Sequence, residues 1–434
     1  MQIERVVVET LSPVRKRVEV EVPASEVQGE LDRAYATVGR DARIRGFRQG
    51  RVPRAVLERM FGDQIQREVL GRLVEHSFHH AIESEHLDVV GAPEIDADGI
   101  TPGQNLKYSA TVDIRPIITI GETSGIDIVR PLYEVSGDDV EQVVTSMRES
   151  VAQLRPIEDR TVIEAGDVVT VNVATVLDGA APQKRDGALV EAGGGSFPLA
   201  LEQQLVGQHK GGRLTLDVPY PADYGNAALA GKTVHFDVEI VDLKTKELPL
   251  LDDEFAKDHG RAETLAELRA RIRTDLEAQA SARADAEVQQ ALLDALIARH
   301  GFDVPPSLVD RRCDALLSAF EVRIPDGPEG AQILERLRAD VRPRAEHEVR
   351  VDLLLDAIGA ARGVMIDDTA VDEEIDTLAR RQKQAPERIR AFYERPEARH
   401  ALRSRIGRER TVTLVLSEAK VTTQQMPQDV ARAE

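Results

Sequence analysis

Residues 46–53 read Gly46-Phe47-Arg48-Gln49-Gly50-Arg51-Val52-Pro53, and this octapeptide is the most informative stretch of the chain. Its two glycines allow the backbone to turn tightly, and its proline suits the first turn of a following helix. The phenylalanine stands between charged neighbours, where burial in a core is difficult. The octapeptide therefore predicts a surface loop that presents one aromatic side chain among arginines, an arrangement suited to docking onto another molecule.

Positive charge is concentrated around this loop, although the chain as a whole is acidic. Residues 40–59 contain seven arginines against Asp41 and Glu58, a net charge of +5, whereas the 434-residue chain carries −20. A guanidinium group is a planar fork of donors that suits phosphate oxygens. Two interpretations follow: a docking loop for a phosphate-rich partner, or a solvated basic loop without one. The overall charge argues against a protein that coats nucleic acid.

The segments around the loop predict an α+β unit. Residues 3–22 alternate between valine and charged side chains, which indicates strands with one apolar face. A capping-box pattern predicts a helix over 25–40. After the loop, we expect a short helix over 53–62 that ends at a glycine, then a longer helix over 63–85 with an apolar stripe. A returning strand follows at 107–114.

The rest of the chain changes character twice. Residues 116–156 predict an extended connector with one helix. Residues 167–243 consist of short β-rich runs separated by glycines, which predicts a small, bent antiparallel sheet packed against a helix at about 198–206. From residue 247 onward the pattern is helical, opened by a capping box at 264–267. We expect prolines to divide this part into separate helices, at Pro305, Pro325, Pro343, Pro386 and Pro396.

Composition limits the class of protein. With 42% hydrophobic and 30% charged residues, about three domains can each bury a core and keep a solvated surface. The single cysteine, Cys313, excludes an internal disulfide and every metal site built on several cysteines. No run of about 18 apolar residues occurs, so we expect no membrane segment and a cytoplasmic location.

Three local signals do not support a further site. His76, His79 and His80 have a helical spacing that zinc can use, but no cysteine or suitably placed glutamate completes a site, so we expect surface histidines and no metal. Residues 193–196 are glycine-rich but lack the Gly-Lys-Ser/Thr of a phosphate loop, so no nucleotide is expected. Cys313 lies in an apolar helix, which predicts a packed thiol rather than a nucleophile.

The octapeptide resembles the G-F-R-x-G-x-x-P signature of the trigger factor family, the ribosome-associated bacterial chaperones. Shorter matches follow in the same order along the chain, at Val69-Leu70-Gly71, Gly91-Ala92-Pro93, Glu247-Leu248-Pro249, Glu254-Phe255 and Asp303-Val304-Pro305. The resemblance covers nearly the whole chain. It implies an α+β multidomain fold with a ribosome-binding α+β domain (1–115), an extended connector with a helix (116–156), an FKBP-like antiparallel β-sheet domain with a helix (157–246), and an all-α chaperone domain with helical arms (247–434).

By resemblance, the arginine-rich loop is the ribosome-binding site, at Arg45, Gly46, Phe47, Arg48, Gln49, Gly50 and Arg51. Gln49 stands where the family usually has lysine, which removes a charge and should weaken attraction to phosphate; Arg51 is placed to compensate. The implied partners are the large ribosomal subunit near the exit tunnel (protein and RNA), unfolded nascent polypeptides and, off the ribosome, a second copy of the chain. The resemblance implies no cofactor, no nucleotide and no membrane.

The 157–246 domain raises the question of prolyl isomerisation. An FKBP-type site lowers the X–Pro barrier of about 18–20 kcal/mol by holding the prolyl ring in an aromatic pocket. The resemblance places this pocket at Val173, Phe197, Leu201, Tyr224 and Phe236. Val173 and Leu201 stand where the family has phenylalanine, so the pocket has lost aromatic side chains. Isomerase activity and a peptide-binding module without catalysis both remain open.

The helical residues 262–420 mix Arg and Glu with Leu and Ala. This pattern fits scattered apolar patches that hold unfolded chains weakly and reversibly, and it also fits an ordinary helical bundle. The resemblance favours the chaperone interpretation. The candidates for an apolar, client-binding arm tip flank the break at 325–330: Phe320, Ile324, Ile333 and Leu337.

The first hypothesis is therefore an ATP-independent, ribosome-associated chaperone that keeps nascent chains open and unaggregated, and so assists folding and export. One alternative is mainly an FKBP-type peptidyl-prolyl isomerase whose other domains position it. Another is a free cytosolic holdase, which predicts no association with ribosomes.

Overall fold

The structure is a computed structural model that describes residues 3–44, 47–48, 50–97, 99–101, 103–177, 183–194, 199–221, 229, 231–258, 262–319, 327–382 and 385–426. The chain divides into two compact units. One comprises Met1–Arg130 with Ala286–Thr423, and the other Pro131–Asp285 with Gln424–Glu434. Among the helices that these described ranges contain, none is long and apolar enough to cross a membrane.

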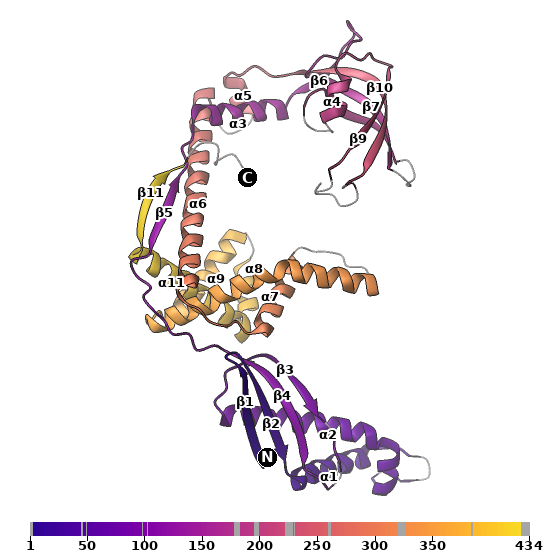
Figure 1. The fold of residues 1–434 in the computed structure, drawn as a ribbon, viewed down its shortest axis with the longest axis vertical. Coiled ribbons are helices and arrows are strands. Elements are labelled where there is room, and N and C mark those ends of the chain that lie inside the picture. Colours follow the sequence, from indigo (N-terminus) through magenta and orange to yellow (C-terminus); the bar gives the residue numbers. More distant parts are fainter. Residues whose placement is uncertain are drawn as a thin grey trace. The chain divides into compact units, whose positions relative to one another are not determined.

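The N-terminal part is an antiparallel sheet with two helices on one face (Figure 1). The strand order is β1-β2-β4-β3. The elements are β1 (Arg5–Ser12), β2 (Arg15–Val22), α1 (Ala24–Asp41), α2 (Arg54–Ser84), β3 (Val89–Ala97) and β4 (Leu106–Ile114). The period-two alternation in β2 places its valines against the helices, as predicted, and its charged residues on the opposite face.

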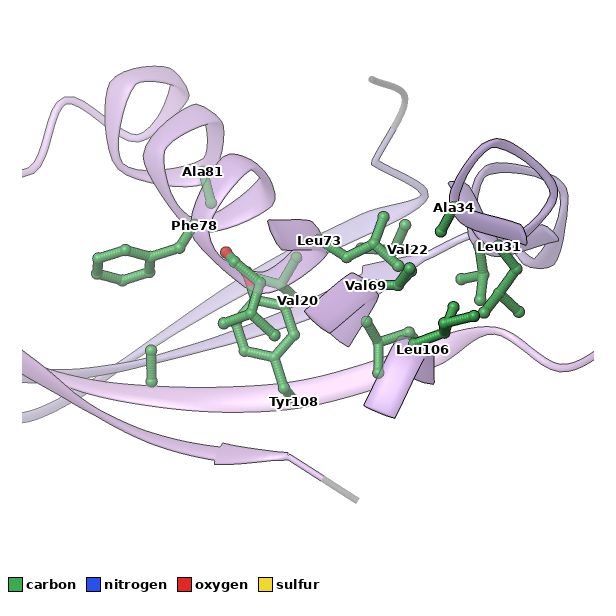
Figure 2. Packing of buried hydrophobic residues seen from close by; sticks show 14 of the residues in the cluster. Val20, Val22, Leu31, Ala34, Val69, Leu73, Phe78, Ala81, Leu106 and Tyr108 are labelled. Carbon is green, nitrogen blue, oxygen red and sulfur yellow. The ribbon is translucent and has the colours of Figure 1, made fainter. Parts of the chain in front are cut away.

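Figure 2 shows how the helices cover this sheet. Side chains of α1 and α2 point towards those of β2 and β4, and the labelled residues are Leu31, Ala34, Val69, Leu73, Phe78, Ala81, Val20, Val22, Leu106 and Tyr108. The Tyr108 hydroxyl lies inside this core, where it makes a hydrogen bond of 2.7 Å with Ser77 Oγ. Burial raises the pKa of Tyr108 to about 12. The core thus holds one satisfied polar pair.

The same unit contains the helical C-terminal part. Its elements are α7 (Pro306–Ala319), α8 (Pro328–Ala361), α9 (Asp368–Gln382), α10 (Pro386–Tyr393) and α11 (Pro396–Glu418), joined by the last turns of α6 (Leu265–Arg299). Leu292 and Leu296 of α6 pack against Leu354 and Ile358 of α8 and Val415 of α11. As predicted, the described residues from 265 to 418 are almost entirely helical, so this part of the fold is all-α.

The second unit contains a five-stranded antiparallel sheet with a short helix. The order is β6-β10-β7-β8, and β9 also pairs with β10. The elements are β6 (Gln153–Pro156), β7 (Val168–Leu177), β8 (Gln183–Glu191), α4 (Leu199–Leu205), β9 (Arg213–Pro219) and β10 (Thr233–Glu247). α4 buries Leu201 and Leu205 against this sheet. The expected antiparallel sheet with a helix at about 198–206 is therefore confirmed.

A small helical cluster completes the second unit. It is formed by α3 (Gly137–Ser150), α5 (Asp253–Asp258) and the first half of α6. Val140 and Val144 of α3 pack with Phe255 of α5 and with Leu268 and Ile272 of α6. Separately, β5 (Asp127–Leu132) pairs with β11 (Lys420–Gln425) as a two-stranded ribbon.

Two expectations about helix ends in the N-terminal part are wrong. The capping box at 25–28 does not form: α1 begins one residue earlier, and the Ala24 N–H donates to Asn105 Oδ1 at 2.9 Å instead. Gly62 does not end a helix, because α2 runs through it without interruption. Leu57 and Ile65 lie on either side of Gly62 in the same buried core, and this packing outweighs the roughly 1 kcal/mol that a helical glycine costs.

The expectation that Pro343 separates two helices is also wrong, because this proline lies inside α8. A proline removes one helical hydrogen bond and usually ends or kinks a helix. Here both sides of the proline are packed: Val341 and Ala345 contact the cluster formed by Val309 and Cys313 of α7. Packing against α7 therefore keeps the helix continuous through position 343.

Candidate functional site

The arginine-rich loop joins α1 to α2. Arg45, Gly46 and Gln49 lie outside the described residues. Phe47 is 42% exposed, and its N–H donates to the Ile44 carbonyl at 3.1 Å. The Arg51 N–H donates to the Arg48 carbonyl at 2.9 Å, and Gly50 has a φ of 75°, a conformation that glycine adopts without strain. Two local turns thus shape the loop, and its aromatic side chain stays out of the core, as predicted.

A clamp at Arg54 fixes the base of the loop. The Arg54 guanidinium pairs with Asp32 of α1 and with Glu58 one turn further along α2, at 2.7 Å for Glu58. It also lies 4.9 Å from the centroid of the Tyr35 ring. The hydrogen bond from Arg54 lowers the pKa of Asp32 below its usual range. Arg54 is therefore occupied in joining the two helices and is not available to an external phosphate.

Other arginines of the loop have no such contact. Arg43, Arg48, Arg51 and Arg59 are exposed. Within the ranges that the structure describes, none of the four forms an ion pair. Exposed guanidinium groups that form no ion pair have their N–H donors available to a polyanion. The sequence predicted the concentration of positive charge in this loop. It did not predict that Arg54 pairs with Asp32, because that contact depends on how α1 and α2 pack.

Three of the five residues expected in a prolyl pocket are described, and they come from β7, α4 and β10. Val173, Leu201 and Phe236 are all buried in one core cluster, so the fold brings these three together. Phe197 and Tyr224 lie outside the described residues. A cavity of about 170 Å³ adjoins Val173. Its other lining residues are mostly polar or charged: Asn172, Ala174, Lys184, Asp186, Arg213, Asp237 and Glu239.

The first helical arm consists of α7 and α8. Arg342 of α8 pairs with Asp310 of α7 at 2.7 Å, and Cys313 is buried between the helices. Burial raises the pKa of the Cys313 thiol, in agreement with a packed thiol rather than a nucleophile. Of the predicted client-binding residues, Ile333 is 41% exposed and Leu337 is partly exposed, both on α8. Phe320 and Ile324 lie outside the described residues.

The three histidines at 76–80 are exposed on α2, in agreement with the expectation that they are surface residues. Buried Ser77 and Phe78 lie between them and face the core instead. Sequence reasoning missed another feature, a groove lined by α3 and α6, because the same helical stripe also fits an ordinary core.

Three family models match successive ranges of the chain. Residues 4–147 match the family model described as bacterial trigger factor protein, residues 264–417 match the model of its C-terminus, and residues 159–241 match that of FKBP-type peptidyl-prolyl cis-trans isomerase. A solved structure titled for promiscuous substrate recognition by the trigger factor chaperone aligns over 95% of this chain and 99% of that chain, with 21% identity and a TM-score of 0.46.

Full-length relatives agree with these matches. The trigger factor of Anaeromyxobacter dehalogenans (strain 2CP-C) is 35% identical over 426 residues, which cover 96% of this chain and 99% of that protein. The trigger factor of Geotalea daltonii is 31% identical over 422 residues, covering 96% and 97%. The chain therefore belongs to the trigger factor family.

Proposed function

We propose that the chain docks on the large ribosomal subunit near the exit tunnel through the loop between α1 and α2. As a member of its family, the chain is a ribosome-associated chaperone that carries an FKBP-type domain. The observation that carries the docking proposal is the exposure of Phe47 beside unpaired arginines in a chain of net charge −20. A local cationic site of this kind suits ribosomal RNA phosphates, and an exposed aromatic suits a protein surface.

The experiment is ribosome co-sedimentation of a variant in which Arg45, Phe47 and Arg48 are all changed to Ala. The variant should pellet much less than wild type. A matched control changes Arg336, Arg381 and Phe392 to Ala; all three are exposed and lie in the helical domain. Wild-type binding by the loop variant would reject the docking proposal and favour a free holdase.

The helical domain is proposed to shield emerging apolar segments without ATP. The support is the exposed apolar surface of α8 at Ile333, beside partly exposed Leu337. Together with Phe320 and Ile324, which lie outside the described residues, these residues are the proposed arm-tip contacts with clients. Changing all four to Ser should reduce the suppression of aggregation of a proline-free client, whereas unchanged suppression would remove the assignment.

Prolyl isomerisation is the second candidate function. The match of residues 159–241 to the FKBP-type model and the presence of Phe236 favour it. Two aliphatic side chains, Val173 and Leu201, replace expected aromatics, so we propose a rate below the usual level of such domains. A protease-free assay on a prolyl peptide tests this, and a rate at that usual level would show that aliphatic side chains suffice.

The location, assembly and domain limits of the chain are also proposed. We propose a cytoplasmic protein that uses no nucleotide and self-associates when it is off the ribosome. The domain limits proposed are 1–115, 116–156, 157–246 and 247–434. Light scattering with and without ribosomes, at several protein concentrations, tests the self-association, and a monomer at all concentrations would reject it.

A further inference from the structure

A large groove lies in the second unit, beside the cluster of α3, α5 and the first half of α6. Its cavity is about 1160 Å³. The lining comes from residues 133–135, from one face of α3, from one face of α6, and from Gln425 and Met426 at the end of β11. Its apolar members are Tyr133, Val135, Val143, Met147, Leu276 and Met426. Neither the ribosome loop nor the prolyl pocket uses these residues.

The apolar wall of the groove is the uncovered side of the cluster. Val140 and Val144 of α3 are buried, whereas Val143 and Met147 form the adjacent stripe of the same helix and are only partly buried. Leu276 of α6 is likewise partly buried, one turn beyond buried Ile272. The described part of the chain thus leaves an apolar strip open beside a fully packed one. Such a strip on a folded protein usually marks a binding surface.

Charged side chains at the groove are largely engaged by neighbours. Asp139 Oδ2 accepts the backbone N–H of Ser136 at 2.8 Å and closes the capping box of α3. The guanidinium of Arg283 lies 4.8 Å from the centroid of the Tyr133 ring. Glu134 is exposed to solvent. The other polar lining residues are neutral amides and hydroxyls, Gln142, Ser146, Ser150, Gln279 and Gln425.

This combination defines the chemistry of the ligand. The wall offers apolar contact, while the amides and hydroxyls can donate to or accept from a peptide backbone whatever its sequence. Met147 and Met426 supply flexible thioethers, which adapt to side chains of different shape. The cavity is larger than the roughly 300–1,000 Å³ of a typical small-molecule site, which suits several residues of a chain.

We propose that this groove binds a short extended segment of unfolded polypeptide through its apolar side chains. The inference rests on the proposed chaperone function and gives it a client site in addition to the arm-tip residues at 320–337. A second contact matters energetically, because two weak sites engaged by one client bind it far more tightly than either does alone.

The test introduces a large side chain on α6 that fills the groove. Ala280 lines the cavity, whereas Ala278 is exposed and lies on the opposite face of the same helix. Ala280→Trp and Ala278→Trp are therefore a matched pair. The chain has no tryptophan, so each variant also carries a single fluorophore at a known position. The probe is a fluorescein-labelled, Trp-free apolar peptide, and fluorescence anisotropy measures its affinity.

The Ala280→Trp variant should bind this peptide roughly five- to tenfold more weakly than wild type, and Ala278→Trp should bind as wild type does. Addition of unlabelled peptide should change the indole emission of the Ala280→Trp variant and leave that of the Ala278→Trp variant unchanged. Met147→Ser is a smaller change on α3, and it should weaken binding in the same direction. It keeps the test valid if the larger side chain disturbs α6.

The contrary outcomes are distinguishable. If wild type binds the peptide and all three variants bind it equally, the groove is not a client site, while the chaperone function stands. If Ala280→Trp alters only the oligomeric state seen by light scattering, a second copy is the occupant and the proposal is overturned. If wild type neither binds the peptide nor suppresses aggregation, the proposed function itself fails.

Discussion

Asp113 of β4 caps helix α7: its Oδ2 accepts a hydrogen bond from the backbone N–H of Ser307, 2.8 Å away. The helix is preceded by Pro305, whose side chain has no oxygen with which to cap it. Ser307 in turn donates from Oγ to the carbonyl of Val90 in β3 at 3.1 Å. The first arm helix is thus joined to the N-terminal sheet by two hydrogen bonds, both of which Ser307 donates.

We expect Asp113→Ala to lower the free energy of unfolding by about 1–2 kcal/mol, because a partly buried helix terminus loses its cap. The guanidinium of Arg15, whose Nε lies 3.5 Å from Asp113 Oδ1, also loses its neighbour. Urea unfolding followed by circular dichroism measures the change. Asp96→Ala, at an exposed position of the same sheet, should change stability by less than about 0.5 kcal/mol. Equal effects of the two substitutions would contradict the capping role.

Gly91 lies at the same joint and should not tolerate a side chain. Its φ is +83°, and an added Cβ would come within 2.6 Å of the Ser307 side chain. Gly103 has a similar φ of +78° but open space around it. We expect Gly103→Ala to cost about 1 kcal/mol of unfolding free energy for backbone strain alone. Gly91→Ala should cost about 1–3 kcal/mol more.

Calorimetric melting of these two glycine variants checks the contact. Both should melt below wild type, with Gly91→Ala clearly the lower. Identical midpoints for Gly91→Ala and Gly103→Ala would show that β3 does not approach Ser307 closely.

Asp167 should make the stability of the FKBP-type domain depend on pH. It is almost fully buried, Arg160 donates to both of its oxygens at 2.6 Å, and the Glu164 N–H donates to it at 2.7 Å. Burial acts to raise the pKa of Asp167, but these hydrogen bonds outweigh it, so the pKa is lowered. The carboxylate therefore stabilises the fold above its unfolded pKa, near 3.9. That contribution is lost as pH falls through the lower folded value.

Asp167→Asn should lower the free energy of unfolding by about 2 kcal/mol at pH 7. The gap between variant and wild type should narrow at pH 3, because that pH lies below the unfolded pKa of about 3.9, so folding no longer gains the full advantage of the ionised carboxylate. Urea unfolding at the two pH values measures this. A gap of the same size at both would mean that ionisation of Asp167 does not matter to the fold.

Arg54 and Arg51 should have separable roles. Arg54→Ala removes the clamp on Asp32, Glu58 and Tyr35, and it should lower stability by about 1 kcal/mol. Arg51→Ala should leave stability within about 0.5 kcal/mol of wild type and weaken ribosome binding. Thermal unfolding and co-sedimentation of both variants separate the two roles. A loss of stability in Arg51→Ala would place that residue in the fold rather than in docking.

Regular periodicity predicted most of the fold. The alternation of Val18, Val20 and Val22 determines which face of β2 is buried, because one face of that sheet is covered and the other is not. Thr264 was also predictable, since its Oγ1 accepts the Glu267 N–H at 3.2 Å within a single turn. Signals of this kind involve residues close together in sequence, and local physics therefore suffices for them.

Contacts between distant residues were beyond the sequence alone. The first N–H groups of α1 and α7 donate to side chains in or next to β4. Ala24 of α1 donates to Asn105, which precedes β4, and Ser307 of α7 donates to Asp113 of β4. In each case the partners are more than 80 residues apart. The local capping box at 25–28 was the wrong expectation for the same reason, because the distant amide takes its place.

In the candidate site, too, features set by nearby residues could be predicted, whereas features that depend on contacts between helices could not. The exposure of Phe47 followed from its charged neighbours and the adjacent glycines. The division of the arginines into a structural one, Arg54, and exposed ones such as Arg48 did not follow, because it depends on the packing of α1 on α2. The groove beside Met147 could not be predicted either. An apolar stripe on a helix does not show which of its residues other elements cover and which stay accessible.

Ribosome binding measured across a salt series tests the central claim most directly. Each phosphate contact contributes about 0.7–0.9 to the slope of log affinity against log salt. Arg48→Ala combined with Arg51→Ala should weaken binding and reduce that slope by about 1.4–1.8. Arg336→Ala combined with Arg381→Ala removes the same charge from exposed positions of α8 and α9 and should leave the slope unchanged. Docking through this loop would be contradicted if the affinity of wild type for ribosomes did not change with salt concentration, or if the two double variants had equal slopes.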